Sequence, residues 1–344
     1  MRKLLNTLYV TTPESYVLLD GENVVIKQDN VEKFRIPFVN IENIVCFNYM
    51  GCSPALMGKC SERNVSLNFM SPSGRFLGKV IGETKGNVLL RRQQYRDADD
   101  ESFCISISKN FISAKIHNSR YVLGRVVRDH KDKIDFLKVN NVMDSFKESI
   151  QKINDADSID KIRGIEGECA KLYFGIFDEM IVKQKDHFSL KFRTKRPPLD
   201  NVNAMLSYMY TILTFEIQSA LETVGLDPYV GFMHTDRAGR ASLALDVIEE
   251  LRAYMVDRLV LSMINLVQIK PDDFLQKEGG AVLMKDECRK KILKCWQDKK
   301  NEIIEHPFIG EKIQIGLIPY VQVQLLARYI RGDIEDYPPF LCKF

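Results

Sequence analysis

The sequence lacks the patterns that mark a zinc-stapled, disulfide-bonded or membrane-spanning protein. Its eight cysteines form no CxxC pair and no paired cysteine–histidine spacing, which argues against a structural zinc site and, in a chain of 344 residues, against a disulfide scaffold. Its longest uncharged runs, residues 201–215 and 313–327, have 15 residues each, fewer than a spanning helix needs. We therefore expect reduced thiols, no membrane segment and a cytoplasmic location.

Two common catalytic motifs are also missing. The absence of HExxH excludes a zinc protease of that type, and the absence of GxSxG leaves a serine hydrolase unsupported. The formal net charge is only +3, so nucleic-acid binding would have to rest on local patches. Residues 183–196 and 289–300 each carry six basic residues and one acidic residue. Each stretch is either a solvated surface or a site for a polyanion.

The predicted secondary structure changes once along the chain, from strands to helices, and this change together with the chain length indicates two domains. Residues 8–95 contain short strand-like runs separated by turns, with a hairpin signal at Asp20-Gly21 and a short helix predicted after Ser53-Pro54. From Phe103 the apolar period becomes about 3.6, and the charged residues 91–101 in between read as a linker or as the entry to the first helix. We predict an α+β protein of two domains: a β-sandwich-like domain (residues 1–95) and an all-α catalytic domain (residues 96–344).

The most informative stretch is GFMHTDRAGRASLALDVIEELR, residues 231–252. A helix is expected to begin near Ser242, since carboxylates are favoured near a helix N-terminus. At about 100° per residue, its acids fall on one arc and its apolar residues on the opposite one. The acidic arc comprises Asp246, Glu249, Glu250 and Asp257, and the apolar arc comprises Val247, Ile248, Leu251, Met255 and Leu259. We therefore predict one buried face and one face that gathers negative charge.

Two other segments contain residues that packing alone does not explain. Glu166 is flanked by Gly164 and Gly167, and each glycine weakens a helix by about 1 kcal/mol relative to alanine. Either close backbone approach is needed there, or Glu166 is a first-turn acid that complements the helix dipole. Asn203 and Ser207 share a face of a helix predicted over residues 202–222, which Asp200 or Asn201 can cap and Gly225 can end.

A histidine, several carboxylates and neighbouring arginines favour one kind of chemistry. Carboxylate oxygens prefer a hard divalent cation such as Mg²⁺, and the imidazole of His234 tilts the choice toward Mn²⁺. Arg237, Arg240 and Arg252 are expected near such a centre if the substrate carries phosphates. The combination is typical of metal-assisted phosphoryl transfer on nucleic acid.

Three segments in register carry a family resemblance. RGIEG (residues 163–167), RPPLDNVNAMLSY (residues 196–208) and GFMHTDRAGRASLALDVIEELR (residues 231–252) together resemble the CRISPR-associated integrase family, the adaptation protein called Cas one. The resemblance covers essentially the whole chain and is closest to the versions that accompany type I-C systems. It implies the same order of a β domain followed by a helical catalytic domain.

The resemblance also implies roles for individual residues. Glu166, His234 and Glu249 match the family's metal ligands, and Asp246 matches a further acid that is either a ligand or an orienting residue. Many members have aspartate at the second acid of the pair, where this chain has Glu249, and Glu250 is an alternative to it. The catalytic residues are thus expected to be Glu166, His234, Asp246 and Glu249, with Mg²⁺ or Mn²⁺ as cofactor. The residues expected to bind DNA are Arg196, Arg237, Arg240 and Arg252.

The implied reaction is the insertion of a captured DNA fragment into a CRISPR array as a new spacer, by attack of a 3′-hydroxyl on a phosphodiester of the repeat. The implied partners are DNA (a prespacer duplex and the CRISPR repeat), a second copy bound through the β domain, and a small ferredoxin-like second adaptation protein that completes a heterohexamer in the prokaryotic cytoplasm. Two alternatives stay open: a stand-alone structure-specific metal-dependent DNA nuclease, and a silent DNA-binding scaffold whose acids form a solvated helix face.

Overall fold

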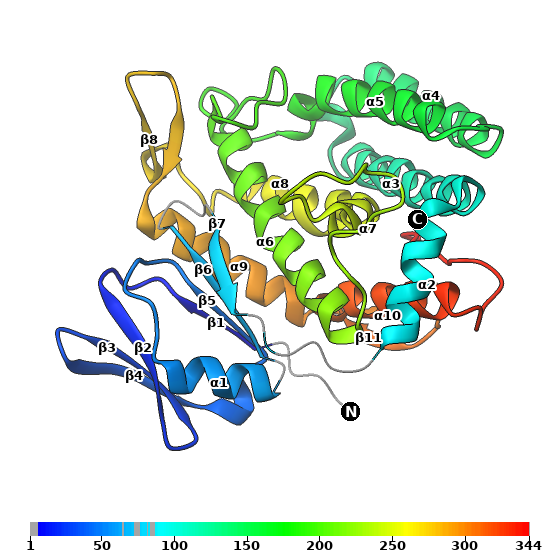
Figure 1. The fold of residues 1–344 in the computed structure, drawn as a ribbon. Coiled ribbons are helices and arrows are strands. Elements are labelled where there is room, and N and C mark those ends of the chain that lie inside the picture. The colour runs from blue at the N-terminus through cyan, green and yellow to red at the C-terminus, as the bar shows by residue number, and fades with distance from the viewer. Residues whose placement is uncertain (1–5, 64, 72–75, 81, 83–86, 344) are drawn as a thin grey trace. The chain divides into compact units, whose positions relative to one another are not determined.

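The computed structural model describes residues 6–63, 65–71, 76–80, 82 and 87–343. The chain divides into two compact units, each described here by itself. The β unit comprises the described residues up to 86 together with 284–302 and 314–317, and the helical unit comprises residues 87–283, 303–313 and 318–343. Strands come first and helices dominate afterwards, so the predicted α+β class is confirmed (Figure 1).

The β unit contains two sheets. β1 (Thr7–Val10), β5 (Asn43–Cys46), β6 (Ser66–Met70) and β7 (Phe76–Val80) form one sheet in that order, and β2 (Ser15–Asp20), β3 (Asn23–Gln28) and β4 (Val31–Pro37) form an antiparallel one. The predicted hairpin at Asp20-Gly21 joins β2 to β3, and Gly21 has the positive φ of +58° that such a turn requires. Both sheets and α1 (Pro54–Arg63) share one apolar core.

The β unit differs from the predicted domain in its border and in the later segments that join it. The predicted border at residue 95 falls inside α2 (Val88–Asp99), which belongs to the helical unit and is no linker. Its Leu90, Gln94 and Asp97 are buried at helical spacing, which shows that this face of the helix packs against the rest of its unit. In addition, α9 (Asp286–Asn301), whose buried side chains include Trp296, belongs to the β unit and not to the predicted helical domain.

The helical unit is organised around α3 (Glu101–His130), which contacts α4 (Phe136–Asn154), α5 (Ile159–Gly175) and α7 (Ser242–Arg252). α6 (Asn201–Val224) covers another side of α7, as Figure 1 shows in green and yellow. α7 continues through a π-helical turn (Ala253–Asp257) into α8 (Arg258–Asn265), and α10 (Ile318–Ile330) packs on α6. This arrangement brings α3, α5 and α7 together.

Local sequence signals explain several of these helix ends. The Asp200 side chain accepts a hydrogen bond from the Asn203 backbone at the start of α6, and Gly225 ends that helix in the left-handed conformation with φ +95°. The part of the chain after residue 95 is mostly helical but not all-α, because two short hairpins occur in it. They are formed by β8 (Phe274–Gln276) with β9 (Val282–Met284) and by β10 (Ile303–Glu305) with β11 (Lys312–Gln314). Within the described residues, no helix has both the length and the apolar character to cross a membrane.

Candidate active site

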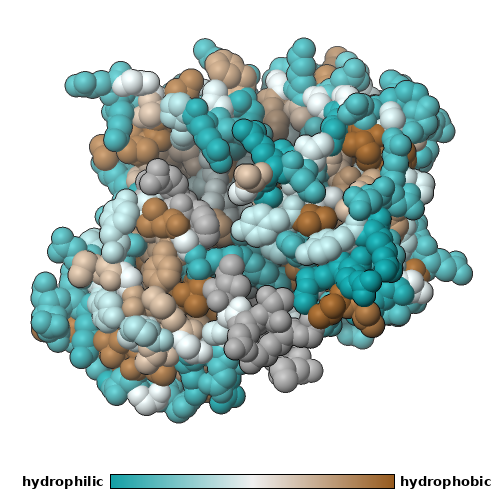
Figure 2. Space-filling model, in the orientation of Figure 1, coloured by the Kyte–Doolittle hydropathy of each residue, from teal (hydrophilic) through white to brown (hydrophobic). Residues whose placement is uncertain are grey.

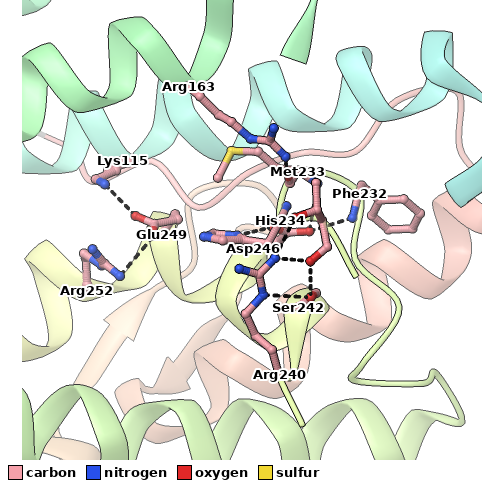
Figure 3. Close-up of polar contacts among 11 residues, drawn as sticks. Lys115, Arg163, Phe232, Met233, His234, Arg240, Ser242, Asp246, Glu249 and Arg252 are labelled. Atoms are coloured by element: carbon pink, nitrogen blue, oxygen red, sulfur yellow. Dashed lines mark hydrogen bonds and ion pairs between the residues drawn. The ribbon is translucent and has the colours of Figure 1, made fainter. Parts of the chain in front are cut away.

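The buried carboxylate of Asp246 organises the loop that carries His234. One oxygen, Oδ2, accepts hydrogen bonds from the backbone N–H groups of Phe232 (2.7 Å) and Met233 (3.1 Å). The other, Oδ1, accepts from the backbone N–H of His234 (3.0 Å) and lies 2.6 Å from Nδ1 of its ring (Figure 3). A carboxylate can only accept, so Nδ1 carries the proton and Nε2 is left as the ligating nitrogen. Both oxygens of Asp246 are therefore used inside the protein, which is the geometry of an orienting residue.

Close packing keeps this loop against α7. A Cβ atom added at Gly231 would lie 2.8 Å from Oδ2 of Asp246 and 2.8 Å from the carbonyl carbon of Ser242, so only glycine fits there. Arg240 donates to the carbonyl of Thr235 and, at 3.0 Å, to its hydroxyl oxygen. The helix begins at Ser242 as predicted, and the Ser242 hydroxyl makes no helix cap but donates to the Thr235 carbonyl at 3.2 Å. The guanidinium of Arg240 thus braces its own loop.

One lysine joins two of the predicted ligands. Lys115 of α3 is ion-paired with Oε1 of Glu166 on α5, and its Nζ lies 2.7 Å from Oε2 of Glu249 on α7. Arg252 holds the other oxygen of Glu249 at 3.0 Å. Burial by itself would raise the pKa of Glu249, but the charges of Arg252 and Lys115 lower it from 4.5 to about 2. Glu249 is therefore ionised at neutral pH.

The predicted metal ligands fit a divalent ion in their chemistry, although they are not yet gathered around one point. Glu166 and Glu249 come from different helices and share the ammonium group of Lys115, and Oε2 of Glu249 is buried against that group. His234 is close enough to Glu249 to contribute to its lowered pKa. In the ranges that the structure describes, however, no three His, Cys, Asp or Glu side chains are close enough together to hold a metal ion as they stand.

Glu250 lies on the same helix but is used elsewhere. Its carboxylate accepts hydrogen bonds from the Tyr337 hydroxyl (2.5 Å), the Phe340 backbone (2.8 Å) and the Gln322 amide (3.3 Å). Burial raises its pKa from 4.5 to about 7. Glu250 therefore fastens the C-terminal segment to α7, whereas Glu249 is the acid that shares the Lys115 ammonium with Glu166. The alternative in which these acids form a solvated helix face is wrong, because Asp246, Glu249, Glu250 and Asp257 are all buried.

Comparison with known proteins gives these residues a context. The sequence model of the family described as CRISPR associated protein Cas1 matches residues 8–298. The chain belongs to the Cas1 family. It is 50% identical to CRISPR-associated endonuclease Cas1 1 of Chlorobaculum tepidum and 45% identical to CRISPR-associated endonuclease Cas1 2 of Rhodospirillum rubrum, and each alignment covers 100% of both chains.

Solved structures show the same fold. The chain of a casposase bound to integration product has a TM-score of 0.83 and 24% identity, with 98% of this chain and 94% of that one covered. A Cas1 protein from Thermotoga maritima has a TM-score of 0.81 and 19% identity, with 98% of this chain and 100% of that one covered. The names of these relatives give no CRISPR subtype, so closeness to the type I-C versions stays a prediction.

Beside the acids, this Cas1-family chain places a buried polar network that the sequence did not reveal. The hydroxyls of Tyr210 and Tyr173 both donate to Asp257, the latter at 3.1 Å. Burial raises the pKa of Asp257 from 3.8 to about 6. The guanidinium groups of Arg252 and Arg193 lie 5.0 and 5.5 Å from the centre of the Tyr210 ring. Because this network holds Arg252, its guanidinium has a structural function in addition to any contact with DNA.

Other contacts could have been suspected from the sequence. Arg193 donates to Oδ1 of Asn203 (2.6 Å) and to the Ser207 hydroxyl (3.0 Å), which explains why two polar residues lie on a buried face of α6. Arg163, in the RGIEG segment, donates to the Met233 carbonyl and so ties the helix of Glu166 to the loop of His234. Lys115 gives no such signal, because it is one lysine in a 30-residue helix.

The two basic stretches differ in how exposed they are. In residues 183–196, the basic side chains other than Arg193 are exposed, including Arg196; Arg237 is exposed as well. In residues 289–300, which lie on α9, Lys299 and Lys300 are buried, with Lys299 bound to Glu302 at 2.6 Å and Lys300 to Thr7 at 3.2 Å. The first stretch is therefore the better candidate for a DNA contact.

Proposed function

We propose that this protein is a metal-dependent DNA integrase and endonuclease of CRISPR adaptation. The observation that carries the proposal is that Glu166 of α5 and Glu249 of α7 converge on the ammonium group of Lys115. The ring of His234 is directed toward Glu249 by its bond to Asp246 (Figure 3). Membership of the Cas1 family and the endonuclease names of its relatives support it.

The site residues divide into ligands and residues that position them. Glu166, His234 and Glu249 would hold Mg²⁺ or Mn²⁺, which when bound neutralises the scissile phosphate and stabilises the leaving oxygen. Asp246 orients His234, and Arg252 holds one oxygen of Glu249. The 3′-oxygen of the captured fragment forms a bond to phosphorus while the bond to the neighbouring 3′-oxygen of the array breaks. One phosphodiester replaces another, so no water is consumed and no protein nucleophile is required.

The four arginines that the sequence predicts to bind DNA differ in their exposure. Arg196 and Arg237 are exposed, and we assign them to phosphate contacts, which are salt-dependent. Arg240 and Arg252 act on the site chiefly by holding its loop and its acid.

The β unit has exposed apolar side chains that suit a contact between two copies, and Figure 2 shows apolar side chains among hydrophilic ones on the drawn face of that unit. They are Val31, Phe34, Val39, Tyr49 and Met50. A chain of the same fold occurs in a Cas6-RT-Cas1–Cas2 complex, with a TM-score of 0.83, 22% identity, and 100% of this chain and 37% of that one covered. We propose that this chain also binds the second adaptation protein, a small ferredoxin-like protein, and that the two form a heterohexamer.

A strand-transfer assay tests the proposal. A short duplex with free 3′-hydroxyls is incubated with supercoiled DNA that carries the repeat, with Mn²⁺ and the second adaptation protein. We expect joined products from the wild type and from Glu168→Gln, a matched change at an exposed residue of α5, and none from Glu166→Gln. Cleavage without joining would instead indicate a stand-alone nuclease. Equal joining by Glu166→Gln would contradict the assigned site.

A further inference from the structure

Lys115 has an environment that is unusual for a lysine. Its side chain is 8% exposed, and its neighbours Ala114 and Ile116 on α3 are buried. A buried charge is costly unless ionic partners and hydrogen bonds compensate for it. Here the compensation comes from two carboxylates on two other helices, Glu166 and Glu249. The position of the ammonium group therefore depends on the same two acids that we propose as metal ligands.

A divalent ion and this ammonium group would neutralise the same oxygens. Ligation by Glu249 would draw on Oε2, the buried oxygen that lies 2.7 Å from Nζ of Lys115. An ammonium group has only donors and positive charge, so it repels a cation bound to the same carboxylates. The four-carbon stem of lysine is flexible enough to withdraw the group. The two cations therefore exclude one another from the space between Glu166 and Glu249.

We propose that Lys115 is a tethered competitor of the catalytic metal: it bridges Glu166 and Glu249, must leave when the divalent ion binds, and thereby sets the metal affinity of the site. This inference rests on the proposed function, because it assumes that the two glutamates are ligands. The apparent metal affinity is then the intrinsic affinity of the free site multiplied by the fraction of molecules in which Lys115 leaves the site free. It also keeps two carboxylates paired at low metal concentration.

The test is a calorimetric titration of the full chain with Mn²⁺ alone. If Lys115 leaves the site free in about a tenth of the molecules, Lys115→Gln and Lys115→Met bind Mn²⁺ about ten-fold more tightly than the wild type. Glutamine keeps a donor for the carboxylates, so it serves as the variant that folds if methionine does not. Lys161→Met, at an exposed lysine of α5 paired with Asp157 at 2.7 Å, should bind like the wild type.

The outcomes separate the two claims. Unchanged or weaker Mn²⁺ binding in both Lys115 variants would overturn the competitor role, while binding by the wild type that Glu166→Gln abolishes leaves the proposed site standing. Wild-type binding that Glu166→Gln does not affect would instead overturn the proposed site. As a second readout, the melting temperature of Lys115→Met should fall in metal-free buffer and rise with Mn²⁺ more than that of the wild type, because the unpaired carboxylates gain a cation.

Discussion

Asp246→Asn is the substitution whose cost the structure defines best. The native carboxylate accepts four hydrogen bonds, two on each oxygen, at a residue with no exposed surface. Asparagine keeps one acceptor oxygen and replaces the other with an amide that only donates. With the amide toward Phe232 and Met233, two backbone donors lose their acceptor. With the amide toward His234, the backbone donor of His234 loses its acceptor and Nδ1 must give up its proton to Nε2. At about 1–3 kcal/mol for each unsatisfied group, we expect a loss of about 2–4 kcal/mol in the free energy of unfolding.

Urea denaturation monitored by circular dichroism measures this loss. Asp157→Asn is the control, since Asp157 is 70% exposed in a surface ion pair with Lys161 and should change stability by less than about 0.5 kcal/mol. In the native state, the variant should also lose Mn²⁺-dependent strand transfer, because a neutral amide no longer holds the His234 ring with Nδ1 protonated and Nε2 free. A variant within about 1 kcal/mol of the wild type that retains activity would refute the orienting role.

Three further predictions concern residues of the same unit. Gly231→Ala should lower the free energy of unfolding by about 2 kcal/mol, because the new Cβ meets Asp246 at 2.8 Å. Gly167→Ala should instead raise it by about 1 kcal/mol, since a Cβ there meets nothing within 4 Å and alanine favours the helix; a loss on urea denaturation would show an unseen constraint. Asp257 has a pKa raised by burial from 3.8 to about 6, so it favours the folded state at low pH and this contribution is lost as pH rises through 6. Between pH 4 and 7 the wild type should therefore lose about 2 kcal/mol relative to Asp257→Asn, and parallel stability curves would contradict this.

The sequence predicted the elements of the site better than their surroundings. The helix of Glu249 and the loop of His234 follow from apolar periodicity and from glycine and charge spacing, which are local properties. Periodicity alone does not say what covers a polar face. α3, α6 and the C-terminal segment bury the acids of α7 and supply Lys115, which lies 51 positions before Glu166.

The π-helical turn at Ala253–Asp257 is a second limit of local reasoning. It interrupts the regular 100° spacing after Arg252, so the position of Asp257 relative to Glu249 does not follow from a helical wheel. The predicted domain border differs from the observed one for a related reason. Charged residues of α2 resemble a linker in composition, and α9 resembles its helical neighbours, but long-range packing assigns the two helices to different units.

A crystal structure of the full chain with Mn²⁺, with the ion located by its anomalous scattering, tests the central claim most directly. The account predicts one ion within about 2.3 Å of a carboxylate oxygen of Glu166, a carboxylate oxygen of Glu249 and Nε2 of His234, with the Lys115 ammonium withdrawn from between the two acids. An ion bound elsewhere, or bound to only one of these three side chains, would contradict it.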